Sequence, residues 1–180
     1  MKFTPLPLAG AWLIEMERIR DHRGFNARAW CAEEMAAHGL TTRIAQVNVI
    51  RNGPRGTIRG MHYQRPPFAE TKLFRVTRGA IFDVIVDLRA GSPTRLQWIS
   101  VELNAEDGRL LYVPEGFGQG FQTLADDTEL TYQVSAPYSP AHGSGFRPDD
   151  PAFGIDWPLP VAAISDKDAG WPDFKAEVMA

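Results

Sequence analysis

The sequence has 180 residues, of which 44% are hydrophobic and 23% are charged, with a net charge of -3 at pH 7. This length and composition predict one globular domain, residues 1–180, with a sizeable core. The acidic balance excludes the basic patch that marks nucleic-acid-binding proteins. No stretch approaches the roughly 20 apolar residues that a membrane-spanning helix needs. We therefore expect neither nucleic acid nor a membrane as a partner.

Cysteine usage and the N-terminal residues predict a cytoplasmic protein. Cys31 is the only cysteine, so neither an intrachain disulfide nor a thiolate metal cluster is expected. Residues 1–15 contain two prolines and lack the unbroken apolar run of a signal peptide. Both observations fit a reducing compartment.

Short β-rich runs make up most of the chain. Residues 13–19 predict a first strand that ends at a turn-prone cluster, residues 21–24, and residues 32–38 predict a short peripheral helix stopped by Gly39. Further strands are expected at residues 43–51, 72–78, 80–89, 95–103, 109–114 and 128–135. Because no helical periods lie between them, the pattern predicts an all-β jelly-roll sandwich or barrel. The Pro- and Asp-rich residues after 135 predict an irregular C-terminal tail of turns.

Residues 56–72 combine three side chains that suit acid–base chemistry on an anionic ligand. His62 can accept a proton near neutral pH, Arg59 offers the planar fork that binds phosphate, and Lys72 can hold developing negative charge. Lys72 shares a strand face with Phe74 and Val76, so the lysine is expected to point inward, where lysines are rare unless paired or used. The structural alternative is a core histidine between two surface charges.

Strand geometry leaves two side chains undecided. Tyr132 shares a strand face with apolar neighbours, and a buried phenol needs a hydrogen-bond partner, which either a backbone carbonyl or a site residue would provide. Arg59 and His62 are three residues apart, which in a regular strand sends them to opposite faces. Gly60 between them would allow a bulge that re-aims one of them.

Nine segments occur in a fixed order from residue 21 to residue 169. They are DHRGF (21–25), QVN (46–48), IRGMHYQ (58–64), residues 72–94, VPEGFGQGF (113–121), LTYQV (130–134), DDP (149–151), IDWP (155–158) and SDKDA (165–169). Together they resemble the dTDP-4-dehydrorhamnose 3,5-epimerase family. The resemblance implies a cupin fold and an enzyme that inverts C3 and C5 of a nucleotide-diphosphate-linked 4-keto-6-deoxy sugar without cofactor or metal. It also implies a homodimer that exchanges N-terminal strands.

The resemblance assigns a role to each matching residue. His62 is implied as the proton acceptor, Asp168 as the carboxylate that orients it, Lys72 as the cation that stabilises an enolate, and Tyr132 as the proton donor. The implied substrate-binding set is Arg23 and Arg59 at the diphosphate, Gln46 and Asn48 at the nucleotide, and Arg28, Gln119, Tyr138 and Lys167 elsewhere. A C4 ketone acidifies the hydrogens on C3 and C5, so inversion needs a base and an acid on opposite faces of the sugar.

Three positions depart from the family pattern. Arg28 stands where the family usually has Glu, Gln119 where it has His, and Gly143 where a further Glu is expected. Arg28 reverses the charge at its position, so the alternative to the parent reaction is an epimerase that acts on a different nucleotide sugar or inverts a single centre. The other explanation of the three departures is neutral drift, in which the parent substrate is still bound.

Three other functions are alternatives to the epimerase. A metal-dependent cupin needs several histidines and a carboxylate on one ion, whereas Gln64 and Gln119 stand where ligands would be. A 3,4-ketoisomerase uses similar acid–base groups, but Tyr132 and Asp168 favour the epimerases. A non-catalytic protein that binds sugar nucleotides would explain Gln119, but would not need the proton-transfer residues.

Overall fold

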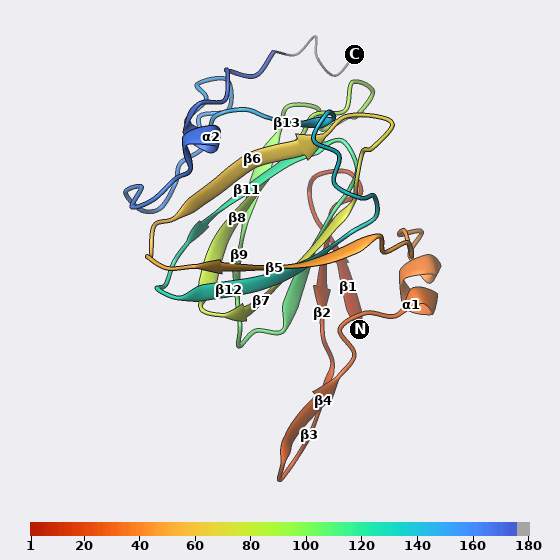
Figure 1. Cartoon of the computed structure of the whole chain (residues 1–180). Helices are drawn as coiled ribbons and strands as arrows, with labels where there is room; N and C mark the ends of the chain where they lie inside the picture. The colour runs from red at the N-terminus through yellow and green to blue at the C-terminus, as the bar shows by residue number, and fades with distance from the viewer. Residues whose placement is uncertain (176–180) are drawn as a thin grey trace.

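Two antiparallel β-sheets pack face to face in the computed structural model, which describes residues 1–175 (Figure 1). The six-stranded sheet has the order β1 (Lys2–Pro5), β2 (Trp12–Glu15), β10 (Arg109–Val113), β7 (Lys72–Arg78), β12 (Thr128–Val134), β5 (Gln46–Asn52). The five-stranded sheet has the order β13 (Gly143–Gly145), β6 (Ile58–Gln64), β11 (Phe117–Thr123), β8 (Ala80–Asp87), β9 (Trp98–Asn104). The predicted all-β sandwich is confirmed.

The main core lies between the sheets. Phe74 of β7 and Leu130 of β12 meet Ile81 of β8 and Phe121 of β11, and all four are almost fully buried. Strand alternation explains this arrangement, because every second residue of each strand faces the opposite sheet. The core fills one end of the space between the sheets and leaves room for a pocket at the other.

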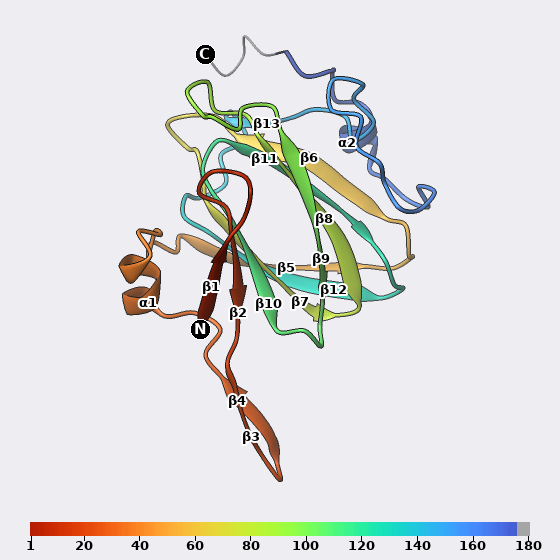
Figure 2. The ribbon, with the colours of Figure 1, turned by 180° about the vertical axis from the view of Figure 1, so that it is seen from behind.

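The outer faces of the sheets are covered unequally. The chain after residue 145 covers the five-stranded sheet, where Phe146 and Phe153 pack on Met61 and Val84. Helix α1 (Ala32–Ala37) covers the six-stranded sheet through Met35. Figure 2 shows these two coverings on opposite sides of the sandwich. Val47 and Val49 on the outer face of β5 stay 62% and 66% exposed.

Several predicted boundaries were wrong. Residues 13–19 form no single strand, because the chain breaks after β2, and β3 (Arg18–Asp21) pairs instead with β4 (Gly24–Ala27). The expected strands did not include β1, whose last residue is Pro5, or the glycine-containing β4, β11 and β13. They gave no bounds for β6, although Arg59 and His62 were expected to lie on a strand. The tail is also less irregular than predicted, since it contains β13 and helix α2 (Asp166–Ala169). Helix α1 was predicted correctly, with Gly39 in the left-handed conformation at φ +69° after its C-cap.

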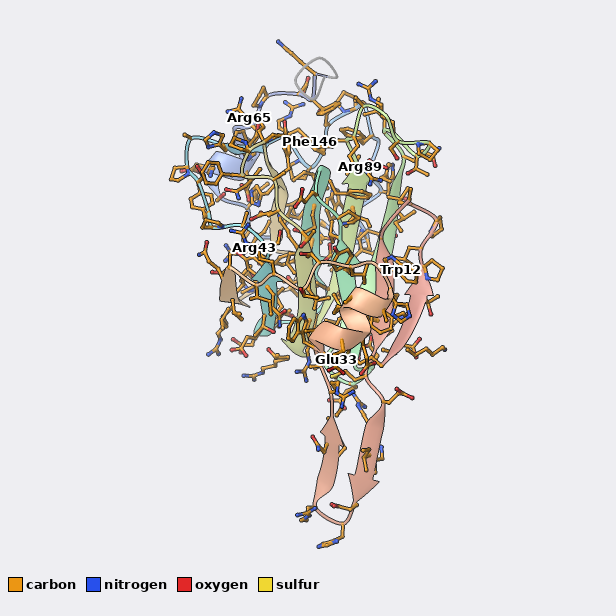
Figure 3. All side chains as sticks on the ribbon, turned by 90° about the vertical axis from the view of Figure 1, so that its right-hand side faces the viewer. Trp12, Glu33, Arg43, Arg65, Arg89 and Phe146 are labelled. Atoms are coloured by element: carbon orange, nitrogen blue, oxygen red, sulfur yellow. The ribbon has the colours of Figure 1, made fainter. Side chains whose placement is uncertain are left out.

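The β3–β4 hairpin is the one part of the described chain that stands away from the sandwich. It extends below both sheets in Figure 1, and Figure 3 shows helix α1, with Glu33, at its base. Ile19 and Phe25 on this hairpin are 75% and 48% exposed. An isolated two-stranded hairpin is marginally stable in water, so this one is unlike the packed strands of the body.

Within residues 1–175, no helix has the length and apolar character required to cross a membrane.

Candidate active site

A pocket of about 500 Å³ opens between the two sheets, beyond the end of the main core. Both sheets contribute to it, and so do the C-terminal helix and the loop before β13. Nine of the side chains predicted for the site line this pocket: Gln46, Asn48, Arg59, His62, Lys72, Gln119, Tyr132, Tyr138 and Lys167. Residues from seven separate parts of the chain therefore meet in one cavity.

A bulge in β6 directs Arg59 and His62 into the pocket together. His62 pairs with Gln119 of β11, and Arg59 pairs with Phe121, so three steps on β6 match two on β11. Gly60 makes this possible, because it has φ +133° and a Cβ there would lie 2.5 Å from the Cα of Gly120. The extra residue in β6 reverses the alternation of side chains, so Arg59 and His62 lie on the same face of the strand.

Helix α2 brings Asp168 to His62 from 106 residues away. The His62 Nε2 lies 2.6 Å from the Asp168 Oδ1, and the Gly60 N–H donates to Oδ2 at 3.2 Å. The helix is held beside β6 (Figure 1) by backbone bonds between residues 56–58 and 162–163, and its first turn is capped by the Ser165 hydroxyl. Burial favours a higher pKa for Asp168, but hydrogen bonds from His62 and Gly60 outweigh it, and the pKa is lowered.

The Asp168 carboxylate is therefore ionised at neutral pH and accepts the hydrogen of His62 Nε2. This leaves Nδ1 of the same imidazole as its free nitrogen. The His62 side chain is 38% exposed, whereas that of Asp168 is 6% exposed. The pair thus presents a proton acceptor to the pocket from the five-stranded sheet, and the buried carboxylate fixes the orientation of the ring.

Lys72 enters the pocket from the opposite sheet. Its side chain is 9% exposed, with Nζ 3.7 Å from Glu70 Oε1, and it donates to the backbone oxygen of His62 at 3.5 Å. Burial lowers the pKa of Lys72, while the charges of Glu70 and Asp83 act in the other direction. Burial likewise raises the pKa of Glu70, and Lys72 opposes that shift. The prediction that Lys72 points inward is confirmed by this geometry.

Tyr132 also reaches the pocket from the six-stranded sheet, where its ring stacks on Phe74 with centroids 5.1 Å apart. Burial raises the pKa of Tyr132, and the nearby charge of Glu70 adds to this effect. The phenol is therefore protonated at neutral pH and able to donate. Since His62 belongs to one sheet and Tyr132 to the other, an acceptor and a donor of protons face the pocket from opposite sides.

Gln119 lies beside a buried acid that the sequence interpretation missed. The Gln119 Nε2 donates to Asp83 Oδ1 at 2.9 Å, and the other oxygen, Oδ2, finds no hydrogen-bond partner among residues 1–175. Burial raises the pKa of Asp83 to about 7, against the opposing effects of Gln119 and Lys72. Asp83 lies within an apolar run of β8, a pattern that marks a buried acid but does not say what it faces.

Arg23 and Arg28 are absent from the residues that line this pocket. Arg23 lies at the tip of the β3–β4 hairpin, where its guanidinium binds Asp21 with Nη2 2.6 Å from Oδ2, and its side chain is 78% exposed. Arg28 follows the hairpin and forms an ion pair with Glu34 of helix α1. The structure thus separates both arginines from the other predicted site residues of the same chain.

Glu70 and Trp171 are among the side chains of the pocket wall that the sequence interpretation missed. Glu70 lies in the loop before β7, and Trp171 follows helix α2. Neither position has a sequence signal, because each depends on how a loop folds back over the sheets. Tyr138 was predicted, and its backbone N–H donates to the side-chain oxygen of Gln46.

The Gln64 side chain forms hydrogen bonds to the loops beside the pocket. Its amide nitrogen donates to Glu70 and to the carbonyls of Phe68 and Pro137, and its oxygen accepts from the Ser139 N–H. In the part of the chain that the structure describes, no three His, Cys, Asp or Glu side chains are grouped as metal ligands.

Comparison with known proteins places this geometry in a family. Residues 5–176 match the profile of dTDP-4-dehydrorhamnose 3,5-epimerase. The chain belongs to the dTDP-4-dehydrorhamnose 3,5-epimerase family. A relative of that name from Sinorhizobium fredii is 44% identical over 97% of this chain and 90% of its own length. The dTDP-4-dehydrorhamnose 3-epimerase of Streptomyces niveus is 38% identical over 93% of this chain and 81% of its own.

A solved structure supports the same assignment. The dTDP-4-dehydrorhamnose 3,5-epimerase of Bacillus anthracis, with TDP and PPi bound, superposes with a TM-score of 0.93 at 40% identity, covering 96% of this chain and 99% of its own. The predicted family, fold and enzyme class are confirmed: the chain is an epimerase of the dTDP-4-dehydrorhamnose 3,5-epimerase family.

Proposed function

We propose that this epimerase inverts C3 and C5 of a dTDP-linked 4-keto-6-deoxyhexose, with His62 as the base and Tyr132 as the acid. The observation that carries the proposal is the placement of these two groups on opposite sheets of one pocket, with the Lys72 ammonium between the same walls. The bound TDP of the Bacillus anthracis relative supports a dTDP-linked substrate.

Each inversion begins when His62 Nδ1 removes the hydrogen from the carbon next to the C4 ketone. The electrons of that C–H bond form a C=C bond, and the carbonyl electrons move to O4, where the Lys72 ammonium stabilises the enolate. Because C3 and C5 both flank C4, one cation at O4 serves both centres.

The second half of each inversion returns a proton from the opposite face. The enolate collapses, the Tyr132 hydroxyl gives its hydrogen to the carbon, and the ketone is restored with reversed configuration. The imidazolium and the tyrosinate then recover their starting states by exchange with solvent, so each turnover introduces one solvent hydrogen at the inverted carbon. Asp168 keeps the imidazole in the productive orientation throughout.

The test is NMR of the protein in deuterated buffer with dTDP-4-keto-6-deoxyglucose, in which the signals of H3 and H5 are followed. Loss of both signals supports the 3,5-epimerase. Loss of H3 alone identifies a single-centre enzyme, the second candidate, which is favoured by the dTDP-4-dehydrorhamnose 3-epimerase of Streptomyces niveus among the relatives of this chain. No exchange with folded protein contradicts the proposal.

We further propose a homodimer in which the N-terminal hairpin of one chain completes the pocket of the other. The hairpin exposes Ile19 and Phe25, and β5, one of the two edge strands of the six-stranded sheet, exposes Val47 and Val49. An exposed apolar edge strand is a template for pairing with another chain. Among the described residues that line the pocket, Arg59 is the one arginine available to bind a diphosphate. Pairing between chains would add Arg23 of the partner subunit as a second.

Size-exclusion chromatography with light scattering tests the dimer. Replacing Val47 and Val49 together by Asp is expected to produce a monomer, since two charges would be buried against an apolar partner. Val161→Asp is the matched control, because Val161 is 53% exposed on the C-terminal tail, and it should leave the dimer intact. A monomeric wild type would overturn the proposal.

A further inference from the structure

Trp171 places its indole on the glycine that pairs with the proposed base. A Cβ built on Gly145 would lie 2.6 Å from the indole Cε2 and Nε1, so only glycine leaves room for the ring. Gly145 of β13 pairs directly with His62 of β6. Directly paired residues of antiparallel strands project to the same face. The indole therefore occupies the side-chain position beside the imidazole, and both line the pocket.

Trp171 does not belong to the hydrophobic core. Phe174, three residues later, packs against Phe146 and Phe153 at centroid distances of 5.6 and 5.3 Å. Trp171 instead forms part of the pocket wall and is half-buried. The Lys167 ammonium lies 5.4 Å from its ring centroid. A large aromatic surface next to a proton-transfer group, with a cation over its ring, suits the polarised C–H face and the hydroxyls of a sugar ring.

Two aromatic rings divide the wall along β13. The Tyr138 ring lies over Gly143, 3.3 Å from the position of a Cβ there, and Trp171 lies over Gly145. These glycines are two positions apart on one strand, which corresponds to about 7 Å. Only the Trp171 ring stands opposite His62, since Gly143 pairs with Gln64.

We propose that Trp171 is a substrate-contacting residue that holds the hexose ring over His62 and so determines specificity for the sugar. The inference rests on the function proposed above, because it takes the ligand beside His62 to be the sugar. Trp171 then contributes to binding of the sugar portion and makes no contact with the nucleotide portion.

The experiment compares two ligands in two variants. For Trp171→Ala we expect kcat/KM with dTDP-4-keto-6-deoxyglucose to fall about tenfold or more, from the apolar contact area lost. The dissociation constant for TDP, measured by calorimetry, should stay within about twofold of wild type because TDP has no hexose. Trp171→Phe should recover most of kcat/KM, since it keeps an aromatic face.

A control and a second readout separate binding from support of the fold. Trp157→Phe alters a tryptophan of the same tail that packs on the core and donates to the Pro148 carbonyl at 2.9 Å. This control should lower the melting temperature without changing the affinity for either ligand. The pH profile of kcat/KM should be the same in Trp171→Ala as in wild type, because the Asp168–His62 pair is untouched.

The possible outcomes are distinct. Unchanged kcat/KM in Trp171→Ala, equal weakening of TDP and sugar nucleotide, or a displaced pH profile each overturns the assignment of Trp171 to the sugar. A wild-type protein that catalyses no exchange overturns the proposed function first, and this inference with it.

Discussion

The pocket and the β3–β4 hairpin contrast in how they hold their charged groups. In the pocket, register between neighbouring strands positions His62 and Lys72, and a 2.6 Å hydrogen bond joins His62 to Asp168. On the hairpin, Arg23 is 78% exposed and its guanidinium binds Asp21, two residues away. The proposed acid–base groups therefore all lie within one chain, whereas Arg23 lies apart from them and reaches a pocket only in the proposed dimer.

This contrast implies a division of labour between chemistry and binding. Proton transfer requires atoms positioned to a fraction of an ångström, which two packed sheets provide. A diphosphate tolerates a flexible guanidinium, because its charge acts over a longer range. Variants in the two regions should consequently fail in different ways.

The largest expected effect is the loss of either proton-transfer group. His62→Ala and Tyr132→Phe should each reduce turnover by about a thousandfold, measured by the NMR exchange assay. The melting temperature should change little in Tyr132→Phe, which keeps the ring that stacks on Phe74. Near-wild-type turnover in both variants would show that the roles are assigned wrongly.

The next effect concerns the orientation of the base. Asp168→Asn should lower kcat by about a hundredfold, since a neutral amide does not stabilise the imidazolium. Asp166→Asn, an exposed acid on the same helix, is the control and should retain full activity.

The same carboxylate should also affect stability at low pH. Because the pKa of Asp168 is lowered in the folded state, its contribution is present at neutral pH and is lost as pH falls through the folded pKa. The melting temperature of wild type should therefore fall more steeply below about pH 4 than that of Asp168→Asn. Parallel curves would mean that the pair does not stabilise the fold.

A mixed dimer tests directly whether the hairpin serves the neighbouring pocket. Arg23→Ala alone should raise KM, by about tenfold, with a smaller change in kcat. In a heterodimer of one His62→Ala chain and one Arg23→Ala chain, purified through two different tags, one of the two sites has both groups intact. We expect about half of the wild-type kcat/KM from this heterodimer. If Arg23 instead acts in its own pocket, both sites are defective and kcat/KM falls to about a twentieth of wild type or less.

The smallest expected effect is the contribution of Asp83, beneath the pocket, to the pH dependence of stability. The pKa of Asp83 is raised to about 7 in the folded protein from an ordinary value of 3.8. The unfolded chain thus releases this proton first, and the free energy of unfolding falls as pH rises towards and through 7. The difference in melting temperature, Asp83→Asn minus wild type, should be more positive at pH 8 than at pH 5. A constant difference would show that Asp83 does not titrate in this range.

Strand alternation made much of the fold and several site residues predictable. The strand at residues 72–78 has the bounds predicted, with Lys72 on the inner face beside Phe74 and Val76. Gly39 marked the end of helix α1. These features are local, because they depend on side chains two to four residues apart on the same element.

Other features followed from the ordered motifs and not from periodicity. His62, Tyr132 and Asp168 were grouped by resemblance to a family, and no local pattern predicts that helix α2 crosses to β6. Glycine-containing strands such as β11 and β13 were missed for a related reason: their residues lack clear alternation, and their pairing decides that they are strands.

The sequence by itself determined an all-β chain with an inward lysine, and it predicted a histidine suited to accept a proton and an arginine suited to bind phosphate, because residue type and alternation are local properties. Only the tertiary structure decided that a bulge at Gly60 turns Arg59 and His62 to one side, and that Trp171 fills the space above Gly145. It also decided that Arg23 and Arg28 lie apart from the pocket. Each of these depends on contacts between segments far apart in the chain, which spacing along the sequence does not encode.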